Sequence, residues 1–124
     1  MVKNILITGG AGYIGSHIVE ILIKQKKKIL IIDNLSTGYS KLINKKAIFL
    51  KINIQKTKKI NIIINKYQID SVIHLAASLV IGVGEKYPKR YYKNNVLGTQ
   101  SILNACKGTK VKNFIFSSTA AVYK

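Results

Sequence analysis

Cysteine is almost absent from this sequence: its 124 residues include one, Cys106. A single thiol excludes an internal disulfide framework and a metal site made of several cysteines. Cys106 lies in a segment with a helical pattern, where we interpret it as a small core residue and not as a nucleophile. The sequence offers no other cluster of metal-ligating residues, so we expect no bound metal.

Long apolar runs are absent as well. No stretch reaches the roughly eighteen residues that a membrane-spanning helix needs, and the N-terminus leads into a predicted strand without the pattern of a signal peptide. We therefore expect no membrane partner and a cytoplasmic location. The length suits one domain that buries about two-thirds of the surface of the unfolded chain, and we find no second domain or repeat.

Acidic residues are scarce: four Asp and Glu stand against 21 Lys and Arg, for a formal net charge of +17. Such a charge attracts nucleic acid at low salt. However, Arg90 is the only arginine, and the lysines are spread over every predicted surface segment instead of gathering on one helix or among aromatic residues. We therefore expect adventitious affinity for nucleic acid but no specific nucleic-acid partner.

The clearest motif that is present is a glycine turn between a predicted strand and a predicted helix. An apolar run at 5–8 leads into the turn, and a helical pattern follows it directly. We predict that the apolar face of this helix comprises Ile14, Ile18, Ile21 and Leu22. The glycines fit either Gly9-x-x-Gly12-x-x-Gly15 or Gly10-x-Gly12-x-x-Gly15, and the sequence leaves both interpretations open.

Each glycine of such a turn has a physical task. One makes the tight turn, one admits a pyrophosphate to the backbone, and one lets the helix pack close to the strand. The N-terminus of the helix adds unpaired N–H groups and a partial positive charge. The motif therefore predicts a phosphate-binding loop, although glycine-rich turns also occur in α/β proteins that bind nothing there.

A second apolar run ends at Asp33, about twenty residues further on, where dinucleotide-binding folds place a ribose-binding acid. A carboxylate at this point would accept hydrogen bonds from the two hydroxyls of the adenosine ribose and would repel a 2′-phosphate. Asp33 therefore favours NAD over NADP. The alternative interpretation is that Asp33 only caps the polar turn at 33–38.

Strand and helix patterns alternate along the chain, which is typical of βαβ units with a parallel sheet. We predict strands at 5–8, 29–32, 47–50, 71–75 and 112–116, helices at 56–67 and 88–106, and a loop with a partial helical turn at 76–84. Right-handed crossovers then give an α/β fold, a Rossmann-type doubly wound parallel sheet with strand order 3-2-1-4-5 that ends after strand 5. Ligands bind at the carboxyl ends of the strands, beside the point where this order reverses.

These motifs resemble the extended short-chain dehydrogenase/reductases, which include NAD-dependent epimerases and dehydratases. The segments that carry the resemblance are 8–17, 33–38, 74–77, 91–99 and 112–123. More narrowly, the segments are similar to the subgroup that epimerises UDP-hexoses at carbon 4, although other sugar-nucleotide epimerases and dehydratases share much of this half. The resemblance implies NAD as the cofactor and a UDP-hexose as the substrate.

By position, the resemblance also implies which residues contact the cofactor. The pyrophosphate would be held by the glycine turn, with Gly9, Gly12 and Gly15, and by the backbone N–H groups of Tyr13 and Ile14. The adenosine ribose would contact Asp33 and Asn34, and the adenine would contact Asn53 and Ile54. The cofactor would pass Leu75, Ala76 and Ala77 beside strand 4, and its nicotinamide side would face Asn94 and Ser117. Asn53 stands where the family usually has aspartate, so we expect a weakened contact. Asn94 could instead be a solvent-facing helix residue, and we interpret His17 and His74 as structural.

Thr119 aligns with the catalytic Ser or Thr of the family, whose hydroxyl binds the 4-oxygen of the sugar. The family completes the chemistry with a Tyr-x-x-x-Lys pair, in which the tyrosine removes the 4-hydroxyl proton while hydride passes from C4 to NAD. None of the seven tyrosines of this chain has a lysine four residues later. The resemblance places the pair beyond the last residue.

We therefore expect residues 1–124 to be an incomplete NAD-binding Rossmann domain without its sugar-nucleotide domain, inactive as an epimerase by itself. Two alternatives stay open. The chain could be a non-catalytic NAD-binding module, as a monomer or a homodimer, or a decayed fragment that folds poorly because strand 5 and some helix faces are left uncovered.

Overall fold

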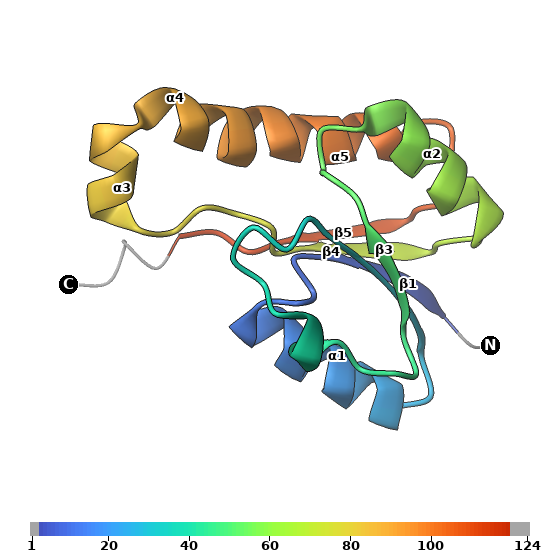
Figure 1. The fold of residues 1–124 in the computed structure, drawn as a ribbon. Helices are drawn as coiled ribbons and strands as arrows, with labels where there is room; N and C mark the ends of the chain where they lie inside the picture. The colour runs from blue at the N-terminus through green and yellow to red at the C-terminus, as the bar shows by residue number, and fades with distance from the viewer. Residues whose placement is uncertain (1–2, 120–124) are drawn as a thin grey trace.

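The computed structural model describes residues 3–119, which form a five-stranded parallel sheet (Figure 1). The strands are β1 (Asn4–Thr8), β2 (Lys28–Asp33), β3 (Ile48–Lys51), β4 (Ser71–His74) and β5 (Asn113–Phe116). Their order is β3-β2-β1-β4-β5, so the predicted Rossmann-type sheet is confirmed. The order reverses between β1 and β4, and this switch point is where a doubly wound sheet presents its ligand crevice.

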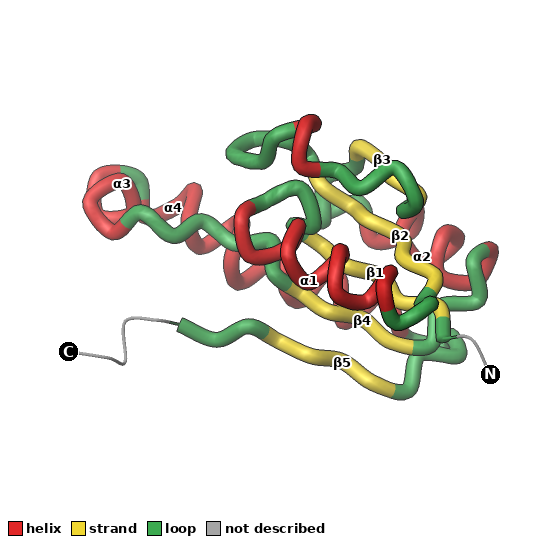
Figure 2. Tube along the Cα trace, turned by 90° about the horizontal axis from the view of Figure 1, so that it is seen from below, coloured by secondary structure: helices red, strands yellow, loops and turns green. Residues whose placement is uncertain are grey.

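Helices cover both faces of the sheet. They are α1 (Tyr13–Lys24), the short 3₁₀ turn η1 (Ser40–Leu42), α2 (Thr57–Lys66), α3 (Ile81–Lys86), α4 (Pro88–Tyr91), the π-helical η2 (Tyr92–Leu97) and α5 (Gly98–Cys106). Helix α1 lies on one face, and α2 and α5 lie together on the other, while β3 and β5 form the two edges (Figures 1 and 2). None of the helices in residues 3–119 is long and apolar enough to cross a membrane.

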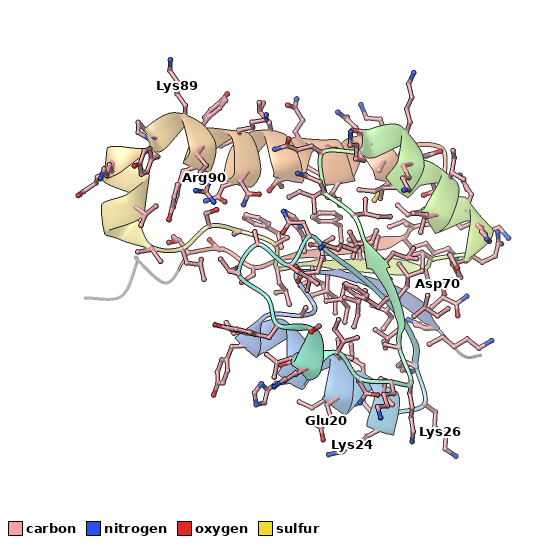
Figure 3. All side chains as sticks on the ribbon, viewed as in Figure 1. Glu20, Lys24, Lys26, Asp70, Lys89 and Arg90 are labelled. Atoms are coloured by element: carbon pink, nitrogen blue, oxygen red, sulfur yellow. The ribbon has the colours of Figure 1, made fainter. Side chains whose placement is uncertain are left out.

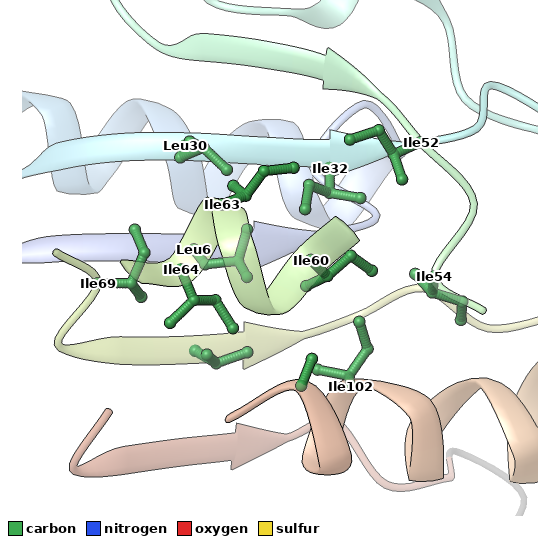
Figure 4. Close-up of a cluster of buried hydrophobic side chains, with 12 residues drawn as sticks. Leu6, Leu30, Ile32, Ile52, Ile54, Ile60, Ile63, Ile64, Ile69 and Ile102 are labelled. Atoms are coloured by element: carbon green, nitrogen blue, oxygen red, sulfur yellow. The ribbon is translucent and has the colours of Figure 1, made fainter. Parts of the chain in front are cut away.

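Alternation along the central strands builds a separate core on each face of the sheet. The core between the sheet and helices α2 and α5 includes Leu6, Leu30, Ile32 and Val72 from the strands and Ile60, Ile63, Ile64 and Ile102 from the helices (Figure 4). The side facing α1 comprises Ile5, Ile7, Ile29, Ile31 and Val19. Because both faces of the sheet are covered, every position of these strands can be apolar, which explains the unbroken apolar runs in the sequence.

The predicted apolar face of α1 is wrong in part. Ile14 and Ile21 are exposed, whereas Gly15 and Val19 are buried at the contact with the sheet. The core face runs along Gly15 and Val19, and the predicted Ile18 and Leu22 pack, partly buried, against the same core. The helix packs closest where it has glycine, so the apolar pattern misplaced the centre of the contact.

The helix predicted from Pro88 onward forms, but not as one regular α-helix. It consists of α4, the π-helical η2 and α5 in direct succession. Within it the Gly98 N–H donates to the Lys93 carbonyl, five residues back, where an α-helix would bond four residues back. Gly108 follows α5 with a φ of +70°, a left-handed conformation that is common just beyond the end of a helix.

Candidate functional site

The carboxyl ends of β1, β2, β4 and β5 surround a cavity of about 1170 Å³ at the switch point of the sheet. The predicted site residues that line it are Gly9, Gly12, Tyr13, Ile14, Gly15, Asp33, Asn34, Ile54, Leu75, Ala76, Ala77, Asn94, Ser117 and Thr119. Asn53 is outside this lining, whereas Ile52 and Ile54 on either side of it contribute. The fold thus brings together residues that are up to 110 positions apart in the sequence.

The glycine turn forms one wall of this cavity through its backbone. Gly9 turns the chain at a φ of +74°, a left-handed conformation that favours glycine. A Cβ on Gly15 would overlap the Gly9 carbonyl oxygen and lie 2.8 Å from the Gly10 Cα, so only glycine lets α1 start this close to the turn. Gly10 instead packs toward the Ile31 side chain. The glycines that line the cavity are therefore those of Gly9-x-x-Gly12-x-x-Gly15.

The N-terminus of α1 opens onto the cavity without a side-chain cap. Gly12 is the N-cap residue, and no side chain accepts a hydrogen bond from the first turn. The first N–H groups of a helix have no acceptor within it, and Tyr13 and Ile14 of this turn line the cavity. This arrangement presents N–H donors and the positive end of a helix dipole to an anionic ligand.

Asp33 is buried at the end of β2 and does two things at once. One carboxylate oxygen accepts from the Leu35 N–H at 2.8 Å and the other from the Ala11 N–H at 3.1 Å. The first bond caps the turn, in which Leu35 adopts a φ of +59°, and the second ties the turn to the glycine loop. A carboxylate offers about four lone-pair directions, so acceptor capacity remains toward the cavity. The two interpretations of Asp33 are therefore compatible.

A chain of hydroxyl and imidazole groups joins β1, β4 and α5 beside the cavity, whose lining includes His74 and Thr99. Thr8 and His74 are neighbours in the β1–β4 register, and Thr8 Oγ1 lies 2.6 Å from His74 Nδ1. On the other side of the ring, His74 Nε2 lies 2.9 Å from Thr99 Oγ1. Phe114 and Phe116 of β5 flank the ring at centroid distances of 6.1 and 6.0 Å. The structural role expected for His74 agrees with these contacts.

The loop after β4 is held by the π-helical segment. Asn95 Oδ1 accepts from the Ser78 N–H at 2.8 Å, and Asn95 Nδ2 donates to the Ser78 carbonyl at 3.0 Å. The neighbouring Asn94 Nδ2 lies 3.1 Å from Ser78 Oγ. Asn94 is therefore a half-buried cavity residue and not a solvent-facing helix position.

Residues 5–124 match the family described as NAD dependent epimerase/dehydratase. The chain belongs to this family.

Relatives within the epimerase/dehydratase family agree in sequence and in structure. The chain is 44% identical to the bifunctional protein GAL10 of Candida maltosa, over 95% of this chain and 82% of that protein. It is 42% identical to the UDP-glucose 4-epimerase of Lactobacillus helveticus, over 97% of this chain and 36% of the relative. The UDP-glucose 4-epimerase of Brucella ovis in complex with NAD has a TM-score of 0.92 at 41% identity, over 98% of this chain and 37% of that structure. The chain thus spans little more than a third of the last two proteins.

Asn53, which the resemblance placed at the adenine, makes a local contact through one side-chain atom. Its Oδ1 accepts from the Gln55 N–H at 3.0 Å in a local turn. Cavity residues that sequence reasoning did not predict include Ser78, Asn95, Thr99, Arg90 and Tyr91. The contact between Ser78 and Asn95 joins a loop to a helix seventeen positions away, so no local pattern shows it. Thr99 and Tyr91 lie inside a segment of the family resemblance, but the motif alone assigns them no contact.

Charge inside the cavity is sparse compared with the outer surface. Of the described residues that line it, Arg90 is the only cation, and Asp33 and Glu85 are the anions. Figure 3 shows Lys89 pointing away from the sheet and Arg90 on the side of α4 that faces it. Glu20 and Lys24 pair at 2.9 Å on the exposed surface of α1. Lysines therefore contribute nothing to the lining within residues 3–119, and backbone N–H groups are the main donors to an anion there.

Burial lowers the pKa of His74 to about 4, from an ordinary value of 6.5. As the pH falls below about 6.5, the unfolded chain binds a proton on this ring, whereas the native chain does not until about pH 4. The contribution of the neutral ring to the free energy of unfolding is therefore fully present above pH 6.5 and is lost as the pH falls to about 4. We expect a loss of about 3 kcal/mol over this window. Urea unfolding from about pH 7.5 to about pH 4.5 measures the loss.

The matched comparison uses the two histidines separately. His74→Gln is expected to flatten the pH dependence whatever it does to the stability at neutral pH, whereas His17→Gln, at an exposed position on α1, should leave it unchanged. Equal pH profiles for the unmutated chain and His74→Gln would show that the His74 ring is not the group responsible.

Proposed function

We propose that this chain is the NAD-binding portion of a UDP-glucose 4-epimerase-like enzyme, in which a UDP-hexose is the substrate of the complete protein. One observation carries the proposal. The uncapped start of α1, the Asp33 carboxylate and the loop after β4 line a single cavity at the switch point of a Rossmann-type sheet. Family membership over residues 5–124 and the NAD complex of the Brucella ovis relative support the same ligand.

The residues fit NAD in size, shape and charge. Side chains on Gly9 or Gly15 would collide with backbone atoms of the turn and of the loop after β4, so glycine is needed there to keep the shape of the turn. We propose that a pyrophosphate lies against the N–H groups of Tyr13 and Ile14 beside this turn. Asp33 then accepts from the adenosine ribose hydroxyls and disfavours a 2′-phosphate. Ile52 and Ile54 offer an apolar surface to the adenine, so Asn53 is not required for it.

At the other end of the cavity, Leu75, Ala76 and Ala77 would border the cofactor, and Asn94 and Ser117 would lie on its nicotinamide side. Bound NAD supplies an acceptor for hydride from C4 of the sugar. The Thr119 hydroxyl orients the 4-oxygen of that sugar. Proton removal from the same oxygen needs a base, and the 124 residues contain no Tyr-x-x-x-Lys pair.

The chain alone is therefore expected to bind NAD but not to epimerise. Isothermal titration of the purified chain with NAD measures the first property. Incubation with UDP-galactose and NAD, followed by chromatography for UDP-glucose, measures the second. NAD binding without product supports the proposal and the interpretation as a non-catalytic module, and formation of UDP-glucose contradicts the predicted inactivity.

A folding control separates the remaining alternative. β5 is an edge strand in the described sheet, and its Ile115 and Phe116 side chains are each 56% exposed. If this surface prevents stable folding, thermal unfolding will be broad and uncooperative, and NAD will not shift it. A cooperative transition that NAD moves upward in temperature indicates a folded cofactor domain.

A further inference from the structure

The Thr99 hydroxyl links the π-helical segment to strand β4. Thr99 Oγ1 lies 2.6 Å from the Asn95 carbonyl oxygen, four residues earlier. A carbonyl oxygen can only accept, so the Thr99 hydroxyl hydrogen points to Asn95. The other contact of Thr99 Oγ1 is with His74 Nε2, and this oxygen must therefore be the acceptor there.

This direction fixes the protonation of the His74 ring. Nε2 carries the hydrogen that it donates to Thr99, so Nδ1 of the neutral ring is an acceptor and receives the Thr8 hydroxyl hydrogen. Thr8 Oγ1 in turn lies 3.3 and 3.4 Å from the N–H groups of Leu75 and Ala76. All hydrogen bonds thus run in one direction, from the loop after β4 through Thr8, His74 and Thr99 to Asn95.

The ring is held neutral by its surroundings. Burial depresses its pKa, and the side chains that contact it from β1, β5 and α5 are Thr8, Phe114, Phe116 and Thr99, none of which ionises. A second proton on the ring would have to occupy Nδ1 and would leave the Thr8 hydroxyl without its acceptor. The neutral Nε2–H tautomer is therefore the form in which the whole chain of hydrogen bonds is satisfied.

We propose that His74 and Thr99 act together as positioning residues that fix the π-helical segment, and with it Asn95 and Ser78, at one end of the cavity. The inference rests on the proposed NAD site, whose nicotinamide end this would be. Asn95 hydrogen-bonds the Ser78 backbone through both its Oδ1 and its Nδ2 atom. The orientation of the Asn95 backbone therefore sets the position of the loop after β4. Neither His74 nor Thr99 needs to touch the reacting atoms.

The first test reads the free protein by NMR and needs no ligand. Long-range ¹H–¹⁵N correlation of the imidazoles should show His74 as the Nε2–H tautomer. Thr99→Val removes the hydroxyl at nearly constant volume, and we expect it to shift the Ser78 amide signal, which Thr99→Ser should restore. An Nδ1–H tautomer, or a Ser78 signal unchanged in Thr99→Val, would overturn the inference.

The second test compares NAD with ADP-ribose, which lacks the nicotinamide ring. Thr99→Val should weaken NAD binding about tenfold, the effect of losing one buried hydrogen bond, and should leave ADP-ribose binding nearly unchanged. Thr109→Val is the control, because the Thr109 hydroxyl also donates to a helix carbonyl, that of Cys106 at 2.6 Å, but lies outside the cavity lining.

The outcomes separate the two proposals. Equal weakening of NAD and ADP-ribose in Thr99→Val contradicts the positioning role while the NAD site stands. If the unmutated chain binds neither ligand, the proposed function fails, and the tautomer and the Ser78 signal still decide whether His74 and Thr99 position the loop.

Discussion

Gly15→Ala is expected to destabilise the chain by about 2 to 3 kcal/mol and to weaken NAD binding at least tenfold. The added Cβ would overlap the Gly9 carbonyl oxygen and approach the Gly10 Cα to 2.8 Å. Both neighbours are backbone atoms of the turn that lines the cavity, so relief requires α1 to move away from β1. The same movement shifts the N–H groups of Tyr13 and Ile14 that are proposed to hold the pyrophosphate.

The measurement is urea unfolding together with NAD titration, and Gly82→Ala is the matched control. A Cβ at Gly82 of α3 would meet nothing within 4 Å, so we expect unchanged or slightly increased stability because alanine favours a helix. If Gly15→Ala binds NAD as tightly as the unmutated chain, the close approach of α1 to the glycine turn does not form the cofactor site.

Asp33→Asn is expected to remove the preference for NAD over NADP. The neutral side chain no longer repels a 2′-phosphate, and the loss of a charged acceptor should lower NAD affinity by about tenfold to a hundredfold. The NH₂ group of the new asparagine will also face either the Ala11 or the Leu35 N–H, so two donors will meet without an acceptor. We expect this to lower the free energy of unfolding by about 1 to 2 kcal/mol. Parallel titrations with NAD and NADP measure the ratio of the two affinities.

Asp70→Asn makes the same change of charge at the far end of the sheet. Asp70 accepts from the Asn4 N–H at 2.8 Å and lies away from α3 and α4, beside which the cavity opens (Figure 3). Its ratio of NAD to NADP affinity should stay that of the unmutated chain. The ribose role of Asp33 is wrong if the unmutated chain already binds both dinucleotides equally well.

The sheet order was predictable because it follows from local signals. Apolar runs alternate with helical patterns, and the handedness of the crossovers then leaves one arrangement. The same logic located Gly9 and Gly12, which lie in the turn after β1, and Asp33, which is the last residue of β2. Residues at the carboxyl end of a strand lie beside the cavity, so their place in the sequence is enough to predict that they line it.

Other features depended on contacts that no local pattern encodes. The core face of α1 includes Gly15, which carries no apolar signal, and Val19, whereas Ile14 and Ile21 were wrongly assigned to it. The contact of Thr99 with His74 joins α5 to β4 over 25 positions of the sequence, and no local pattern shows it. Of the two residues predicted at the adenine, Ile54 lines the cavity and Asn53 does not. The Asn53 Oδ1 atom accepts from the Gln55 N–H in a local turn, and Ile52 is a lining residue that the sequence did not indicate.

The location of NAD on the isotope-labelled chain tests the central claim most directly. Titration followed by amide NMR should shift the signals of residues 9–15, 33–38 and 75–78, which surround the cavity at the switch point, and should leave the lysine-rich outer surface of α2 unchanged. Saturable shifts confined to that lysine-rich surface, or no shifts at millimolar NAD, which is about the weakest affinity a specific site would show, would contradict the account.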